Sequence, residues 1–217
     1  MRVTAVTIVR NEGAVLLEWL AHHRAVGVTD FLVFSNDCQD GTDRMLDRLQ
    51  DLGWLTHLPN PGPYRGGVQW TALRSADRHP LVRRADWLVT MDLDEFINVK
   101  VGNRTLSALA GALPEATAIP LTWRLFGNAG VLRFSDAPVT ETFLRAAPEV
   151  MFWPWRAMMF KTLHRNDGTY RRLGIHRPRK PDPERLDGQR WFDGSGRRLP
   201  QIFHQDRLFT DPGTAPY

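Results

Sequence analysis

The stretch ADWLVTMDLDEF, residues 85–96, indicates both the fold and the chemistry of this chain. The apolar run at residues 86–91 is typical of a buried strand. It ends in an acidic segment that contains Asp92, Asp94 and Glu95. Residues two apart in extended backbone point to the same side, so we expect the two aspartates to face one point in space.

Strands and helices alternate on both sides of this stretch. Apolar runs predict strands at residues 3–9, 31–34, 54–58 and 118–123. Helical spacing predicts helices at residues 15–26, 42–52, 69–79 and 105–113, with Thr42 as the cap of its helix. Beyond about Gly127 the alternation fades, with strand candidates at residues 143 and 150–164, and mostly loop at residues 178–198. The pattern predicts an α/β fold with a mostly parallel central sheet and helices on both faces.

Three polar clusters follow predicted strands, at residues 10–12, 36–40 and 92–95. In open α/β sheets, ligands bind outside the carboxyl ends of the strands. The predicted topology brings the three clusters to one edge of the sheet, although they are far apart in the sequence. This convergence favours a binding site more strongly than any of the clusters alone.

The paired aspartates predict a metal site. Two carboxylates that face one point repel each other and raise each other's pKa, and a hard divalent cation removes this conflict. Mg²⁺ or Mn²⁺ held by one or two carboxylates keeps positions open for a diphosphate and neutralises charge on a leaving nucleoside diphosphate. A solvated acidic turn is the alternative, but acids between buried segments are costly unless they are partnered. We therefore expect Asp92 and Asp94 to be metal ligands.

Composition excludes several classes. The chain of 217 residues carries a net charge of +4 and is 42% hydrophobic, as in ordinary globular proteins. We see no apolar run long enough to span a membrane and no signal peptide, and the lone Cys38 allows no internal disulfide. We expect a cytoplasmic protein.

Arginines gathered late in the chain, at residues 171–198, suggest peripheral contact with the inner membrane, although a solvated basic surface explains most of them. The acidic clusters disfavour nucleic acid as a partner.

Several motifs together resemble bacterial family 2-like glycosyltransferases of the D-x-D type. They are VRNEG at residues 9–13, EW at 18–19, HH at 22–23, NDCQDGT at 36–42, DLDEF at 92–96 and WRLFG at 123–127. The resemblance covers roughly the first 130 residues. It implies a GT-A-like fold with a Rossmann-like nucleotide-binding half, a nucleotide-sugar donor (often a UDP-sugar), and Mn²⁺ or Mg²⁺ as cofactor.

The resemblance also assigns roles. Near the nucleotide it puts Arg10, Asn11 and Glu12, with Asp37 or Asp40 close to the base or ribose. It implies that Asp92 faces the ribose or a metal-bound water and that Asp94 ligates the metal directly. It also implies that Glu95 orients this site or the acceptor. Asp94 and Glu95 are thus the expected catalytic residues. The sugar and acceptor pocket is expected to involve Trp123, Arg124 and Gly127.

Other residues have two interpretations each. His176 is the candidate for a further metal ligand, with His204 as its rival, and either is equally a structural or surface histidine. Arg74 is a candidate for a phosphate contact or an exposed helical arginine. We expect His22 and His23 to pack under the first loop. The aromatic pair Trp153 and Trp155 suits stacking on a sugar or core packing.

Two expected features are missing. Related sequences carry an Asn-His-Tyr motif late in the domain, and none occurs before Tyr217. The acceptor's catalytic base has no clear match; Asp182, Glu184 and Asp206 are weak candidates. We therefore expect a single catalytic domain, with a nucleotide-sugar-binding half at residues 1–100 and an acceptor half at residues 101–217 that is truncated at its C-terminus.

The leading hypothesis is metal-dependent transfer of a sugar, expected to be a hexose, to a saccharide or lipid-linked acceptor in polysaccharide biosynthesis. A nucleotidyltransferase is the alternative, but residues 10–13 lack the Gly-rich phosphate loop typical of that class. A non-catalytic basic binding module is the third candidate, and it leaves the acidic clusters unexplained. The sugar, the stereochemical outcome and the oligomeric state stay open.

Overall fold

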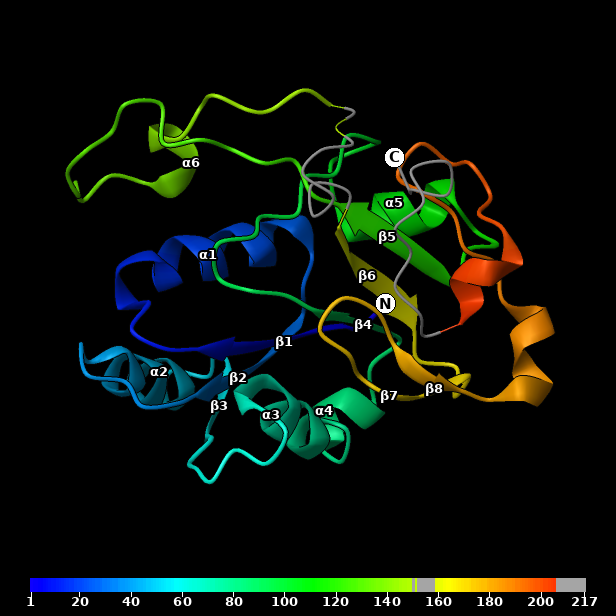
Figure 1. Cartoon of the computed structure of the whole chain (residues 1–217), viewed down its shortest axis with the longest axis horizontal. Coiled ribbons are helices and arrows are strands. Elements are labelled where there is room, and N and C mark those ends of the chain that lie inside the picture. The colour runs from blue at the N-terminus through cyan, green and yellow to red at the C-terminus, as the bar shows by residue number, and fades with distance from the viewer. Residues whose placement is uncertain (150, 152–158, 206–217) are drawn as a thin grey trace.

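A six-stranded sheet forms the centre of the protein in a computed structural model that describes residues 1–149, 151 and 159–205. The strand order is β3-β2-β1-β4-β6-β5 (Figure 1). Four neighbouring strands are parallel: β1 (Val3–Val9), β2 (Asp30–Ser35), β3 (Thr56–Pro59) and β4 (Trp87–Thr90). The sixth strand in the chain, β6 (Phe160–Arg165), is antiparallel to both β4 and β5 (Ala118–Thr122).

Helices cover both faces of this sheet. In Figure 1, α1 (Gly13–Val26) lies above the sheet, and α3 (Val68–Ala76) and α4 (Pro80–Arg83) lie below it. On the same face as α1, α2 (Thr42–Asp51) and α5 (Leu106–Ala112) pack into one core through Leu46 and Leu106. The predicted α/β class, with a mostly parallel sheet between helices, is confirmed.

The remaining elements are short. They are α6 (Val139–Thr142), the antiparallel pair β7 (Tyr170–Arg172) and β8 (Arg179–Pro181), and two 3₁₀ helices at Pro183–Gly188 and Gln201–His204. The long segment that includes α6 is held over α1 by Glu18, whose carboxylate accepts hydrogen bonds from the backbone N–H groups of Val139 (2.7 Å) and Thr140 (3.0 Å).

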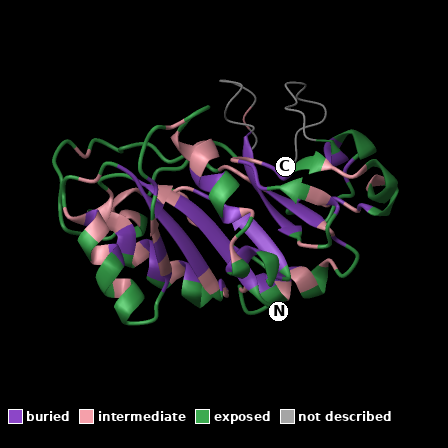
Figure 2. Cartoon of the chain, turned by 90° about the horizontal axis from the view of Figure 1, so that it is seen from below, coloured by how far each residue is buried: buried purple, intermediate pink, exposed green. Residues whose placement is uncertain are grey.

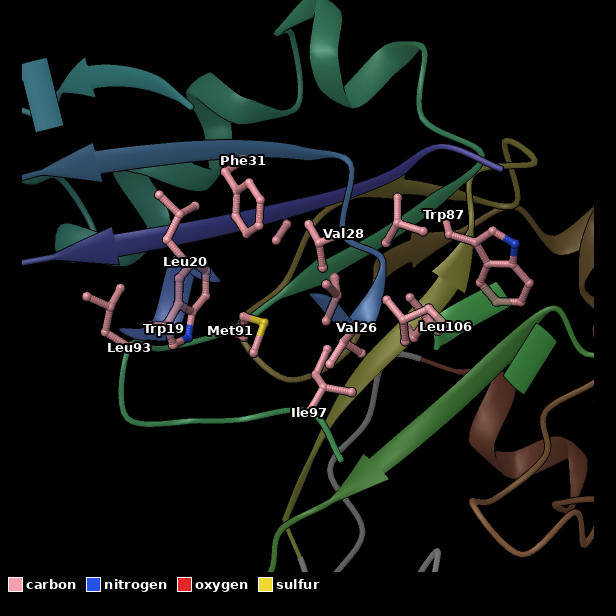
Figure 3. Close-up of a cluster of buried hydrophobic side chains, with 14 of the residues drawn as sticks. Trp19, Leu20, Val26, Val28, Phe31, Trp87, Met91, Leu93, Ile97 and Leu106 are labelled. Atoms are coloured by element: carbon pink, nitrogen blue, oxygen red, sulfur yellow. The ribbon is translucent and has the colours of Figure 1, made fainter. Parts of the chain in front are cut away.

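Burial explains why the central strands form. Six of the seven residues of β1 and all four of β4 are buried, because helices cover both faces of these strands (Figure 2). Trp19, Phe31 and Leu93 lie together in the core on the α1 face (Figure 3). Large aromatic side chains of this kind contribute much of the apolar area that a core buries.

The main error in the predicted elements concerns Thr42. It is the first residue of α2 and does not cap that helix; its Oγ1 accepts hydrogen bonds from the N–H groups of Glu12 (3.0 Å) and Gly13 (2.8 Å) at the start of α1. The third strand begins at Thr56 and not at residue 54. The strand expected within residues 150–160, like Trp153, Trp155 and Asp206, falls mainly or wholly outside the described residues.

The helices of the described residues include none with both the length and the apolar character that a bilayer span requires. The predicted cytoplasmic location and membrane-surface contact remain predictions.

The strand order fixes where a ligand can bind. From β1 the chain passes through α1 to β2 on one side, whereas β4 returns to the other side of β1. The connection from β1 to β2 through α1 lies on one face of the sheet, and the connection from β3 to β4 through α3 and α4 lies on the other face, so a crevice is left at the carboxyl ends of β1 and β4. This switch point lies between the first and third of the predicted polar clusters.

We expect acid to destabilise the protein through His23. Burial lowers the pKa of this fully buried imidazole to about 4, below its ordinary value of 6.5. The folded state therefore resists protonation while the unfolded state accepts it, so stability falls as the pH drops through 6.5 toward 4. The expected loss from this group between pH 7 and pH 5 is about 2 kcal/mol.

Urea denaturation across this pH range measures the effect, with His23→Gln as the matched variant that keeps an acceptor but cannot titrate. The variant should lose less stability than the parent between pH 7 and pH 5. Equal pH dependence in the two proteins would contradict the assignment.

Candidate active site

A cleft of about 350 Å³ opens at the switch point of the sheet. Its lining comes from the ends of β1, β2 and β4 and from the start of α3: Ile8, Val9, Arg10, Glu12, Asn36, Val68, Gln69, Asp92 and Asp94. All three predicted polar clusters contribute to it. The sequence argument that the three clusters meet at one edge of the sheet is therefore correct in its geometry.

The acidic segment is a tight turn and not extended backbone. The N–H of Glu95 donates to the carbonyl of Asp92 (3.3 Å), which closes a turn over residues 92–95. Leu93 is buried in the main core and anchors the turn, while Asp92 and Asp94 both line the cleft. The prediction that extended backbone turns both aspartates to the same side is wrong. Both aspartates nevertheless lie at one site, as predicted.

Helix α1 holds this turn by its backbone. The Trp19 indole Nε1–H donates to the carbonyls of Asp92 (3.1 Å) and Glu95 (3.0 Å), and Trp19 lies beside Leu93 in the core (Figure 3). Nε2 of His23 accepts a hydrogen bond from the N–H of Ile97 (3.2 Å). Nε2 of His22 is hydrogen-bonded to the carbonyl oxygen of Ile97 (2.8 Å). The two histidines are structural, as expected, but their contacts are with Phe96 and Ile97 at the end of the acidic turn and not with the first loop.

The sequence interpretation missed a cation at the acidic turn. Lys161, on β6, is buried, and its Nζ lies 2.8 Å from Asp92 Oδ2 and 3.5 Å from Glu95 Oε2. It also donates to the carbonyl of Ile175 (3.2 Å). A lysine within an apolar run, FKTL at residues 160–163, was the only signal, because its acidic partners are more than 60 residues away in the sequence.

Glu95 points inward from the turn. Its Oε2 accepts from the N–H of Asp92 (2.9 Å). Burial raises the pKa of Glu95 to about 7, although the nearby Lys161 ammonium lowers it. Its Oε1 and the Trp123 indole Nε1 are both buried without a hydrogen-bond partner among the described residues. Glu95 thus braces the turn from inside.

Asp94 and Glu12 carry the open negative charge of the cleft. Asp94 is exposed, and no hydrogen bond or ion pair joins its side chain to another residue in the described part of the chain. Oε2 of Glu12 accepts from the N–H of Arg10 (3.2 Å). Burial raises the pKa of Glu12, and the nearby carboxylates, Asp94 first among them, raise it further.

Three of the predicted nucleotide-binding residues build the loops at the rim. Asn11 Oδ1 accepts from the N–H of Gln39 (2.7 Å), and Asp40 Oδ1 accepts from the N–H and hydroxyl of Thr42 (2.9 and 2.6 Å). These hydrogen bonds lower the pKa of Asp40. Asp37 Oδ2 accepts from the Tyr64 hydroxyl (2.8 Å). None of the three lines the cleft, whereas their neighbour Asn36 does.

Three further predicted residues also lie outside the lining. Arg74 donates to the carbonyl of Arg65 (2.6 Å) and so fixes the Pro- and Gly-rich loop after β3. Nε of Arg124 donates to the carbonyl of Ala147 (2.7 Å), and the N–H of Gly127 to that of Arg145 (3.1 Å). The latter two residues tie together the exposed segment that continues to α6.

The two late histidines differ in position. His176 packs edge-on against Trp123, with ring centroids 5.6 Å apart, and its Nδ1 bonds the carbonyl of Phe160 (3.2 Å). Burial and the nearby Lys161 lower its pKa. His204 is buried against Trp191 and belongs to a separate core cluster. Only His176 is thus close to the acidic turn.

The two described candidates for the catalytic base, Asp182 and Glu184, lie outside the cleft. Asp182 pairs with Arg171 (2.9 Å) and accepts from the N–H of Glu184 at the start of a 3₁₀ helix. Neither acid lines the cleft.

A preformed metal site is absent from the described residues. No three His, Cys, Asp or Glu side chains there converge on a point that could hold a metal. The predicted set of Asp92, Asp94 and His176 is therefore not a ready-made cage. One open carboxylate, Asp94, beside one ion-paired carboxylate fits a cation whose other ligands are water and phosphate oxygens.

The sequence over most of the chain settles the family. The model of glycosyltransferase family 92 matches residues 6–190. This chain belongs to glycosyltransferase family 92. The match confirms the coarser prediction of a glycosyltransferase, whereas the finer label of a bacterial family 2-like protein of the D-x-D type is not confirmed.

Two plant proteins of family 92 are similar to this chain. One from Oryza sativa subsp. japonica is 26% identical over 151 residues, which cover 66% of this chain and 25% of the rice protein. One from Ricinus communis is 27% identical over 99 residues, which cover 44% of this chain and 17% of that protein. The chain thus spans a quarter or less of the length of these curated relatives.

Solved structures with a similar arrangement are more distant. Staphylococcus aureus TarS aligns with a TM-score of 0.46 at 13% identity, over 76% of this chain and 28% of TarS. The complex of TarS 1–349 with UDP gives 0.45 at 15% identity, over 76% of this chain and 47% of that one. Glucosyl-3-phosphoglycerate synthase from Mycobacterium tuberculosis, solved with Mn²⁺ and UDP, gives 0.33 at 17% identity, over 54% and 42%.

We expect Trp19→Phe to destabilise this family 92 chain through the acidic turn. Phenylalanine keeps most of the ring packing but leaves the carbonyl of Glu95 without its donor and the carbonyl of Asp92 with the N–H of Glu95 as its donor. Unsatisfied buried acceptors cost about 1–3 kcal/mol, and urea denaturation measures the loss.

Trp54→Phe is the matched control, because Trp54 is 46% exposed and lies outside the core. Its effect should stay within about 0.5 kcal/mol. If the two variants were equally stable, the indole would not be what holds the turn.

Proposed function

We propose that the cleft binds the diphosphate of a nucleotide-sugar donor and that this chain transfers the sugar, expected to be a hexose, to a saccharide or lipid-linked acceptor. One observation carries the proposal. In a member of glycosyltransferase family 92, the cleft at the switch point of the sheet combines the basic Arg10 with an open acidic residue, Asp94. This is where open α/β sheets bind ligands.

Asp94 is the proposed protein ligand of Mn²⁺ or Mg²⁺. Its carboxylate is exposed in the cleft and has no protein partner among the described residues, so it can approach a cation without breaking an existing contact. When bound, the cation supplies positive charge that stabilises the leaving nucleoside diphosphate. His176, near Asp92 and Lys161, stays a candidate for a further ligand, since Nε2 has no hydrogen bond within the described part of the chain.

The remaining lining suggests how the donor is oriented. Arg10 is exposed at the end of β1 and offers a guanidinium to phosphate oxygens. Asn36 and Gln69, at the end of β2 and the start of α3, present amides that suit a base or ribose. The loops that carry these groups are fixed by hydrogen bonds of Asp37, Asn11 and Asp40, which contribute to the site indirectly.

Glu95 is a positioning residue in this proposal. Its carboxylate bonds the N–H of Asp92 and faces Lys161, so it sets the shape of the turn from within. Trp123 packs beside Glu95 and beside His176. Of the three residues predicted for the acceptor pocket, Trp123 is therefore the one that contacts the acidic turn.

Family membership favours sugar transfer over nucleotidyl transfer, the alternative from the sequence. The loop after β1 agrees, because residues 10–12 contain no glycine and α1 begins at Gly13, so no Gly-rich phosphate-cradling run is present there.

A thermal-shift measurement with UDP, with and without Mn²⁺, tests the proposal. A ligand that binds only the folded state at 100 times its Kd adds about 2.7 kcal/mol, which raises the Tm of a chain of this size by several degrees. We expect this rise only when UDP and Mn²⁺ are both present, and we expect Asp94→Asn to abolish it.

Asp51→Asn is the matched control, since Asp51 is exposed at the end of α2, away from the cleft. It should keep the full shift. An equal shift in Asp94→Asn and the parent would refute the assigned site.

A further inference from the structure

Lys161 reaches the acidic turn from the antiparallel half of the sheet. Leu88 of β4 pairs with His164 of β6, so the start of β6 runs alongside the end of β4. The Lys161 side chain is buried, with 4% of its area exposed. Burial of a cation is costly unless it is paired, so its partners must offset this cost.

Three acceptors surround the ammonium of Lys161. They are Asp92 Oδ2 at 2.8 Å, the carbonyl of Ile175 at 3.2 Å and Glu95 Oε2 at 3.5 Å. An ammonium has three donor hydrogens, and a compact point charge suits acceptors gathered around one atom better than a planar guanidinium does. Lys161 is therefore fully engaged with the protein.

The pairing divides the acids of the turn into two groups. Asp92 is occupied by Lys161 through Oδ2, and its Oδ1 lies 3.5 Å from Nε2 of Gln69. Glu95 is occupied by Lys161 and by the N–H of Asp92. Asp94 alone of these three acids has no hydrogen bond or ion pair with another described residue.

We propose that Lys161 is a positioning residue that reserves Asp92 for the protein and leaves Asp94 as the one carboxylate of the turn that is open to a divalent cation. A single carboxylate holds such a cation weakly, so the diphosphate must supply further ligands. Cation and nucleotide then strengthen each other's binding by the same factor. This inference rests on the proposed function and adds the reason why the metal depends on the donor.

Removing the charge of Lys161 should weaken the dependence of metal binding on the nucleotide. In Lys161→Met the straight side chain remains but the ammonium is lost, so Asp92 faces Asp94 and Glu12 without compensation. A divalent cation relieves that repulsion, and Asp92 becomes available as a second ligand.

The test is Mn²⁺ binding, followed by the electron paramagnetic resonance signal of the free ion, with and without UDP. In the parent we expect weak binding that UDP tightens by about tenfold or more. In Lys161→Met we expect binding without UDP to be about tenfold tighter than in the parent and the effect of UDP to shrink. Lys100→Met is the matched control, because Lys100 is exposed and its one ion pair within the described residues is with exposed Glu149; it should behave like the parent.

Equal Mn²⁺ affinity of Lys161→Met and the parent without UDP would overturn the inference. Failure of UDP to bind either protein would instead refute the proposed function. The two failures can be told apart, because the Mn²⁺ comparison of the variant and the parent is made without UDP. Should Lys161→Met not fold, Asp92→Asn serves: it should weaken the joint binding of Mn²⁺ and UDP far less than Asp94→Asn does. Equal losses in those two variants would also overturn the inference.

Discussion

The pairing of β1 with both β2 and β4 is the constraint on which the rest of this structure depends. Because the three strands are parallel, their carboxyl ends meet at one edge, and because the chain runs from β1 outward to β2 and β3 and then returns to β4 on the other side of β1, that edge is open. The pairing is maintained by strands buried on both faces. The cleft is thus a consequence of strand order, and side chains at the strand ends only decide what it binds.

Two supports from opposite sides then shape the acidic turn. Helix α1 bonds its backbone through Trp19 and His23, and β6 supplies the charge of Lys161 to its side chains. The first support fixes where the carboxylates are, and the second fixes which of them is free. The first support needs a neutral His23, because its Nε2 must accept the N–H of Ile97, and burial lowers the pKa of this imidazole accordingly.

The sequence was sufficient for the parallel half of the fold and for the location of the cleft. Buried parallel strands are continuous apolar runs, and the polar residues that end them mark the carboxyl edge, as at Arg10, Asn36 and Asp92. It was insufficient wherever a partner is distant in the chain. Thr42 looked like a cap for its own helix but bonds the start of α1, and nothing local couples Lys161 to Asp92. For the same reason Arg74 and Arg124 carried plausible side-chain chemistry but, like Gly127, lie outside the cleft lining.

Photoaffinity labelling with an azido derivative of UDP, read out by peptide mass spectrometry, tests the central claim most directly, because it locates the nucleotide on the chain. The account predicts that label displaced by excess UDP lies in peptides carrying the cleft residues 8–10, 12, 36 or 68–69. Displaceable label confined to residues 124–149 or 170–200 would contradict it.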